Sequence, residues 1–103
     1  MDLSHNKITD ISILSKTKFD DLQKLYLSEN KITDIKVFAN VSFSQIQELY
    51  LNMNEIDDIS VFERIKFYQL YGLYLSNNKI DLSFDHNKNI IEKLKIIVKN
   101  LNI

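Results

Sequence analysis

The stretch LYLSENKITDI, at residues 25–35, returns 24 residues later as LYLNMNEIDDI, at residues 49–59. The two phrases share their order of apolar and polar residues. Repetition at a fixed period indicates a chain built from similar units, each too small to bury its apolar face alone and stable only against its neighbours. The fold class therefore follows from one unit and from the way the units stack.

A column of asparagines carries the period along the chain in steps of 24 residues, at Asn6, Asn30, Asn54 and Asn78. Apolar columns keep the same register, with Leu3, Leu27, Leu51 and Leu75 before the asparagines and Ile8, Ile32, Ile56 and Ile80 after them. Further columns run through Ile11, Ile35, Ile59 and, displaced by one position, Leu82, and through Phe19, Phe43 and Phe67. These columns predict a single domain of 103 residues with repeats at about 1–21, 22–45, 46–69 and 70–90.

The spacing Leu22-x-x-Leu25-x-Leu27-x-x-Asn30-x-Ile32 resembles the leucine-rich repeat, and the resemblance covers positions 1–84. The continuation Asn-Lys-Ile-Thr-Asp-Ile at residues 30–35 resembles the internalin-type and phosphatase-regulator-type subgroup. The resemblance implies an α/β repeat solenoid: a right-handed coil with a concave parallel β-sheet and short helical or 3-10 turns on the convex side. It also implies a module that binds partner proteins.

The residues themselves support this shape. Alternate side chains of a strand face opposite ways, so Leu25 and Leu27 should point into the core while Tyr26 points outward. The chain has one Gly and no Pro, so the bend after each strand must be made by other residues, and the Asn side chain can satisfy the backbone groups left unpaired there. An Asp before an apolar pair, as at Asp10, Asp34 and Asp58, is the pattern of a helix N-cap. The phenylalanine column should then fill the convex part of the core.

The two ends depart from the pattern. Residues 91–103 fit a degenerate fifth repeat, with Ile97 aligned to Leu73 and Lys99 in the place of Leu75, or a capping helix with Asn89 and Glu92 as its cap pair. We favour the fifth strand. The first strand has no neighbour before it, so we expect either a piece of a longer repeat protein or two copies that stack end to end as a homodimer.

Composition narrows the possible partners. The 13 basic and 14 acidic residues are interspersed, which argues against binding to nucleic acid or to an anionic membrane surface. No apolar run approaches the roughly 20 residues of a membrane-spanning helix. Without cysteine or the features of a signal peptide, a cytoplasmic location is favoured.

The outward-facing strand residues are the candidate binding site for an unidentified partner protein. Tyrosine provides a large contact area at low entropic cost, which favours the row Tyr26, Tyr50 and Tyr74. The expected neighbours of this row are Ser28, Asn52, Glu29, Met53 and Asn77. The alternative is that stacked tyrosines only stabilise the sheet.

Catalytic and metal-binding arrangements are not evident in the sequence. The two histidines, His5 and His86, lie in different repeats, and no cysteine accompanies them. Glu29 and Glu48 are expected to be solvated strand positions rather than paired acid and base, and Gly72 marks at most a close approach. The sequence therefore predicts a non-enzymatic protein without cofactor or metal.

Overall fold

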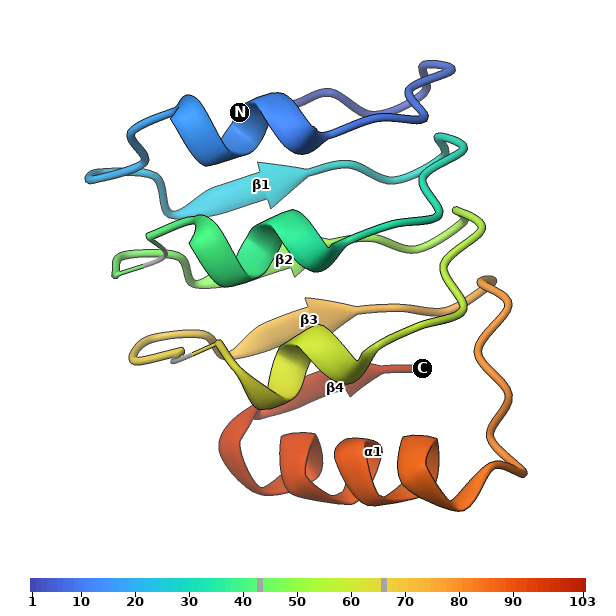
Figure 1. The fold of residues 1–103 in the computed structure, drawn as a ribbon. Coiled ribbons are helices and arrows are strands. Elements are labelled where there is room, and N and C mark those ends of the chain that lie inside the picture. The colour runs from blue at the N-terminus through green and yellow to red at the C-terminus, as the bar shows by residue number, and fades with distance from the viewer. Residues whose placement is uncertain (43, 66) are drawn as a thin grey trace.

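The computed structural model describes residues 1–42, 44–65 and 67–103, and shows coils stacked one upon the next (Figure 1). The strands form one layer and the 3-10 helices lie in front of it. The strands are β1 (Lys24–Tyr26), β2 (Glu48–Tyr50), β3 (Gly72–Tyr74) and β4 (Asn100–Asn102). The helices are η1 (Ser12–Lys16), η2 (Lys36–Asn40), η3 (Ser60–Glu63) and the α-helix α1 (Asp85–Ile97).

The sheet is parallel and keeps chain order, β1-β2-β3-β4. Leu25 pairs with Leu49 and Leu49 with Leu73, so equivalent residues of successive repeats lie side by side. At the N-terminal edge an isolated parallel bridge joins Asp2 to Tyr26. The expected fold class, a leucine-rich repeat solenoid with a parallel sheet and short 3-10 turns, is confirmed.

The core lies between the two layers. Leu25, Leu27, Leu49 and Leu51 are 0% exposed, as the strand alternation predicts. Phe19 is buried and Phe67 is half-buried against the core, while Phe43 lies outside the described residues. Strands contact the strands of adjacent coils, and helices contact the adjacent helices, so burial of each coil depends on its neighbours.

Asparagine side chains bridge consecutive coils at the bend after each strand. In the central coil, Asn54 Nδ2 donates to the carbonyl oxygens of Leu27 (2.9 Å) and Leu51 (3.1 Å), and its Oδ1 accepts the N–H of Ile32 (3.0 Å). Asn30 and Asn78 repeat this pattern one coil earlier and one coil later. Each of these asparagines therefore satisfies backbone groups of two coils at once.

An aspartate lies two residues before each 3-10 helix, and the N-cap position expected for it is held by the isoleucine that follows. Oδ1 of Asp10, Asp34 and Asp58 accepts the backbone N–H two residues ahead, at 2.8, 2.9 and 2.9 Å. The backbone bond from Ser12 holds the pKa of Asp10 below the ordinary carboxyl range, and the Ser60 hydroxyl, followed by the Ser60 backbone N–H, does the same for the pKa of Asp58. The isoleucine after each aspartate is buried, but the expected continuation of that column at Leu82 is wrong, because Leu82 is 43% exposed and helix α1 fills the core there instead.

The C-terminal segment contains both a helix and a strand. Helix α1 begins at Asp85, so the expected cap pair Asn89 and Glu92 lies inside the helix. Strand β4 pairs Leu101, not Ile97, with Leu73, which makes this step 28 residues instead of 24. The helix takes up the extra residues, and the defect expected at Lys99 does not arise.

Candidate functional site

The concave face of the sheet carries a continuous row of tyrosines. The Tyr26 and Tyr50 ring centroids are 4.5 Å apart with the planes inclined by 14°, and those of Tyr50 and Tyr74 are 4.3 Å apart and inclined by 3°. All three side chains are half-buried. Since the ring faces cover one another, the row presents its ring edges and hydroxyl groups to a partner.

The central ring, that of Tyr50, lies between the rings of Tyr26 and Tyr74. Burial, followed by its contact with Tyr74, raises the pKa of Tyr50 well above the ordinary tyrosine range. Its hydroxyl is therefore a proton donor at every physiological pH. Tyr50 thus gives the centre of the row a hydrogen-bond donor.

Gly72 makes room for the last ring of the row. A Cβ atom at this position would lie 3.0 Å from Tyr74 Cε2 and 3.3 Å from Glu48 Cγ. The tyrosine thus folds back over the backbone of its own strand. The close approach expected at Gly72 is present, and the atoms that approach belong to the tyrosine row.

The burial of Glu48 differs from the expectation drawn from the sequence. It was expected to be solvated, but it is only 6% exposed and lies beside the tyrosines. Lys24 Nζ lies 3.0 Å from its Oε2 in an ion pair outside hydrogen-bond geometry, and the Tyr71 hydroxyl donates to its Oε1 at 3.0 Å. Lys24, followed by the bond from Tyr71, holds the pKa of Glu48 below its ordinary value against the opposing effect of burial.

A second row runs beside the tyrosines and consists of Ser28, Asn52 and Ser76, all half-buried. Ser28 Oγ donates to Asn52 Oδ1 at 2.7 Å, which fixes the orientation of the carboxamide. The backbone of Asn52 is also held, because its carbonyl accepts the N–H of Glu29 at 3.1 Å. The row is thus ordered before any partner arrives.

A third row has a backbone conformation that the sequence did not reveal. His5, Glu29, Met53 and Asn77 have φ between 57° and 59°, in the left-handed region. Such angles are unusual outside glycine and asparagine, and the only hint in the sequence was a bend made without glycine. The side chains of Glu29, Met53 and Asn77 are exposed beside the serine and asparagine row.

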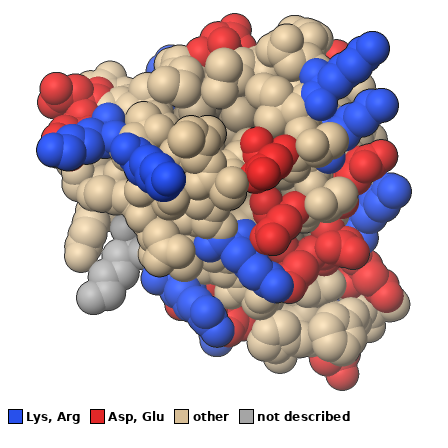
Figure 2. Space-filling view, turned by 45° about the horizontal axis from the view of Figure 1, so that its top comes forward, with Lys and Arg blue, Asp and Glu red and all other residues tan. Residues whose placement is uncertain are grey.

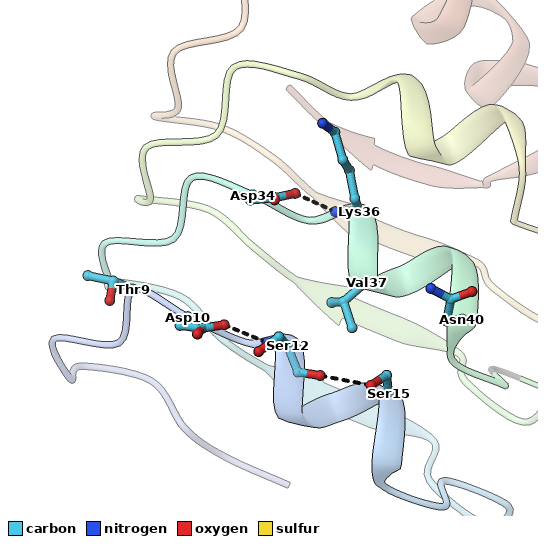
Figure 3. A pocket seen from close by; sticks show the side chains of 8 residues that line it. All are labelled: Thr9, Asp10, Ser12, Ser15, Asp34, Lys36, Val37 and Asn40. Carbon is cyan, nitrogen blue, oxygen red and sulfur yellow. Dashed lines mark hydrogen bonds between the residues drawn. The ribbon is translucent and has the colours of Figure 1, made fainter.

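The convex side offers a different candidate, a shallow hollow of about 530 Å³ between η1 and η2 (Figure 3). Asp10, Ser12, Asp34 and Lys36 line it, and the aspartate oxygens are already bonded to backbone N–H groups at the starts of the helices. Figure 2 shows acidic and basic side chains intermingled on this side of the molecule. The aspartates that line the hollow are therefore occupied by hydrogen bonds to the backbone.

Two further absences hold for the part of the chain that the structure describes. Within it, no group of three or more His, Asp or Glu side chains is placed to hold a metal ion. Outside positions 43 and 66, no helix has the length and apolar character needed to cross a bilayer. The two histidines lie apart, each beside a glutamate: His5 by Glu29 (2.8 Å) and His86 by Glu63 (3.4 Å).

Comparison with known proteins agrees with this geometry. Residues 1–40 match the family of leucine-rich repeats, in two copies. Internalin C2 of Listeria monocytogenes is similar over 99% of this chain, with a TM-score of 0.68 and 29% identity. The internalin inlF of the same species is similar in fold over 97% of the chain, with a TM-score of 0.54 and 22% identity. No curated protein sequence matches the chain.

Residues 1–40 thus match the leucine-rich repeat family, and the chain has the fold of a leucine-rich repeat solenoid. Its repeat is similar to that of internalin C2, in line with the resemblance carried by the phrase at residues 30–35. It spans 38% and 32% of the lengths of the two internalin structures. Folds of this type generally mediate protein–protein interactions and generally have no catalytic activity.

Proposed function

We propose that this chain is a non-catalytic module that binds a partner protein on the concave face of its sheet. The contacts are the tyrosine row Tyr26, Tyr50 and Tyr74, with Ser28, Asn52, Glu29, Met53 and Asn77 beside it. The observation that carries the proposal is the unbroken stack of half-buried rings across three strands. A rigid surface of this kind loses little conformational entropy on binding, which favours affinity.

Charge supports a protein partner over a polyanion. Lys24, the basic residue of the strand rows on this face, is paired with Glu48. The chain as a whole carries a net charge of −1. Nucleic acid and anionic lipid both require an excess of basic groups, which these rows do not offer.

The test uses Tyr50→Ala with Tyr68→Ala as its matched control, because Tyr68 is 74% exposed and lies outside the strands. Proteins from the source organism that are retained by the immobilised chain are purified, and their affinities are measured by calorimetry. We expect Tyr50→Ala to weaken binding about tenfold or more, as for a central aromatic contact, and Tyr68→Ala to leave it unchanged. Equal affinities for both variants would contradict the concave site.

Light scattering of the free chain tests the alternative of end-to-end assembly. Self-stacking would bury the solenoid ends and leave the tyrosine row exposed. A concentration-dependent dimer that is unaffected by Tyr50→Ala would favour assembly over partner binding.

A further inference from the structure

The chemistry of the concave face also indicates what kind of segment it recognises, and this step rests on the proposed function. The faces of the tyrosine rings are occupied by stacking at 4.3 to 4.5 Å, so Tyr50 has no free face for a sugar ring or a cation. The ring edges and hydroxyl groups remain. These groups favour contacts with carbonyl groups and small apolar side chains.

Charged groups of this face already have partners within the chain. Lys24 is paired with Glu48, and Glu29 lies 2.8 Å from His5 Nδ1. Asp2 stands at one end of the tyrosine row, and its Oδ1 accepts the backbone N–H of Ser4. A strongly acidic or basic segment would meet no complementary charge along the centre of the rows.

Asn52 stands out in this neutral surface because its carboxamide is held in one orientation. Ser28 Oγ donates to its Oδ1, and its backbone carbonyl accepts bonds from Glu29 N–H and from Asn54 Nδ2. Among the described residues, no acceptor is bonded to Nδ2 of Asn52. Nδ2 of the half-buried Asn52 side chain, beside Tyr50, can therefore donate a hydrogen bond to an acceptor outside the chain.

We propose that the concave face binds an uncharged peptide segment, and that Asn52 is its specificity-determining contact, donating from Nδ2 to a carbonyl oxygen of that segment. Ser28 is a positioning residue that acts through Asn52. The tyrosine hydroxyls and ring edges supply the adjoining contacts.

The experiment pans a display library of random 12-residue peptides against the immobilised chain. Affinities of the enriched peptides are then measured by fluorescence polarisation at 50 and 500 mM NaCl. We expect peptides without a conserved charge and affinities that change less than about twofold between the two salt concentrations, since neutral contacts are not screened. Cellohexaose and chitohexaose are measured in parallel as neutral sugar probes.

Three variants locate the contact. Asn52→Asp keeps the acceptor for Ser28 but removes the donor, and should weaken binding about tenfold or more. Ser28→Ala frees the carboxamide and should weaken binding about threefold, by a fraction of the hydrogen-bond energy. Asn40→Asp, at the exposed end of η2 on the convex side, is the matched control and should leave binding unchanged. Circular dichroism verifies that each variant is folded.

The outcomes separate this inference from the proposed function. Peptides with a conserved acidic or basic position and steep salt dependence would overturn the inference, as would equal binding by Asn52→Asp, enrichment of no peptide, or binding of the sugars alone. If Tyr50→Ala still abolishes binding of such charged peptides, the concave site stands. If peptides bind Tyr50→Ala and wild type equally, the proposed function itself fails.

Discussion

At the scale of single residues, the asparagines explain how neighbouring coils stay in register. Asn54 is 7% exposed and bonds one N–H and three carbonyl groups that belong to two coils. Asn6 is exposed and bonds only carbonyl groups of its own coil, those of Leu3 and Ser4. Asparagines at the same repeat position therefore differ in whether they connect two coils or bond within one.

Asn54→Ala should lower the free energy of unfolding by about 3 kcal/mol or more, because it leaves buried backbone groups without partners. Asn6→Ala is the control and should cost about 1 kcal/mol or less, since water can replace its bonds. Urea unfolding monitored by circular dichroism measures both. Equal costs would show that the bonds between coils contribute nothing beyond those within one coil.

The left-handed backbone at the position before each of these asparagines suggests a second comparison. Met53 and Asn77 have φ of 59° and 58° and are both exposed. A left-handed angle is costly for most L-residues and least so for glycine and asparagine. Met53→Asn should therefore stabilise the chain by roughly 0.5–1 kcal/mol, and Asn77→Met should destabilise it by a similar amount. Thermal unfolding of the pair checks the sign, and a stabilising Asn77→Met would refute the explanation.

Sequence spacing reveals some of these residues and not others. The asparagines and Tyr26, Tyr50 and Tyr74 are visible because one period places them in register, and alternation in a strand decides which side they face. The burial of Glu48 is not visible, because it depends on Lys24 and Tyr71, each more than 20 residues away, and on the space left by Gly72. Glu48 is therefore a polar residue that is buried by neighbours distant in the sequence.

At the scale of elements, the polar edge of the concave sheet joins β1, β2 and the start of β3. Lys24 precedes Tyr26 in β1, Glu48 opens β2, and Tyr71 immediately precedes β3. One buried carboxylate thus ties three coils together. The Lys24 side chain is 50% exposed, so solvent screens this ion pair and its pH dependence is more informative than its strength.

The lowered pKa of Glu48 fixes the sign of this dependence. Its stabilisation is present above the ordinary glutamate pKa of 4.5 and is lost as the pH falls through the lower value of the folded state. We expect wild type to exceed Glu48→Gln in stability at pH 6 and the difference to shrink progressively below pH 4.5. Urea unfolding at a series of pH values measures the difference. A gap that is constant or widens toward acid pH would argue against a charged Glu48 in the folded chain.

The C-terminal elements show why the 24-residue period alone does not predict which residue pairs with the last repeat. Extending the 24-residue register placed Ile97 opposite Leu73, whereas helix α1 lengthens the step and brings Leu101 there. Both alternatives considered for residues 91–103 are realised in part, because helical spacing at Ile90, Ile91 and Leu94 and a short strand after them coexist. Helix length depends on how the last coil is covered, which is a property of packing.

At the scale of the whole molecule, the stacked coils of Figure 1 contact chiefly their nearest neighbours. The stability of such a solenoid is approximately a sum of the terms for single coils and for the interfaces between adjacent coils. Helix α1 covers the last interface with Ile90, Ile91 and Leu94, all nearly inaccessible. Loss of this cover should destabilise the adjacent coil most and more distant coils progressively less.

Leu94→Ala tests that gradient, because Leu94 is 2% exposed, and Ile96→Ala is its control on the same helix at 85% exposure. A cavity of this kind costs about 2–4 kcal/mol, and the exposed change should cost less than about 0.5 kcal/mol. Hydrogen exchange followed by NMR provides reporters at both ends: the Leu75 amide bonds to the Asn102 carbonyl, and the Leu27 amide bonds to the Tyr50 carbonyl. We expect Leu94→Ala to accelerate exchange at Leu75 far more than at Leu27. Equal acceleration at both amides would mean that the coils open as one cooperative unit. The concave site and the C-terminal helix would then unfold together.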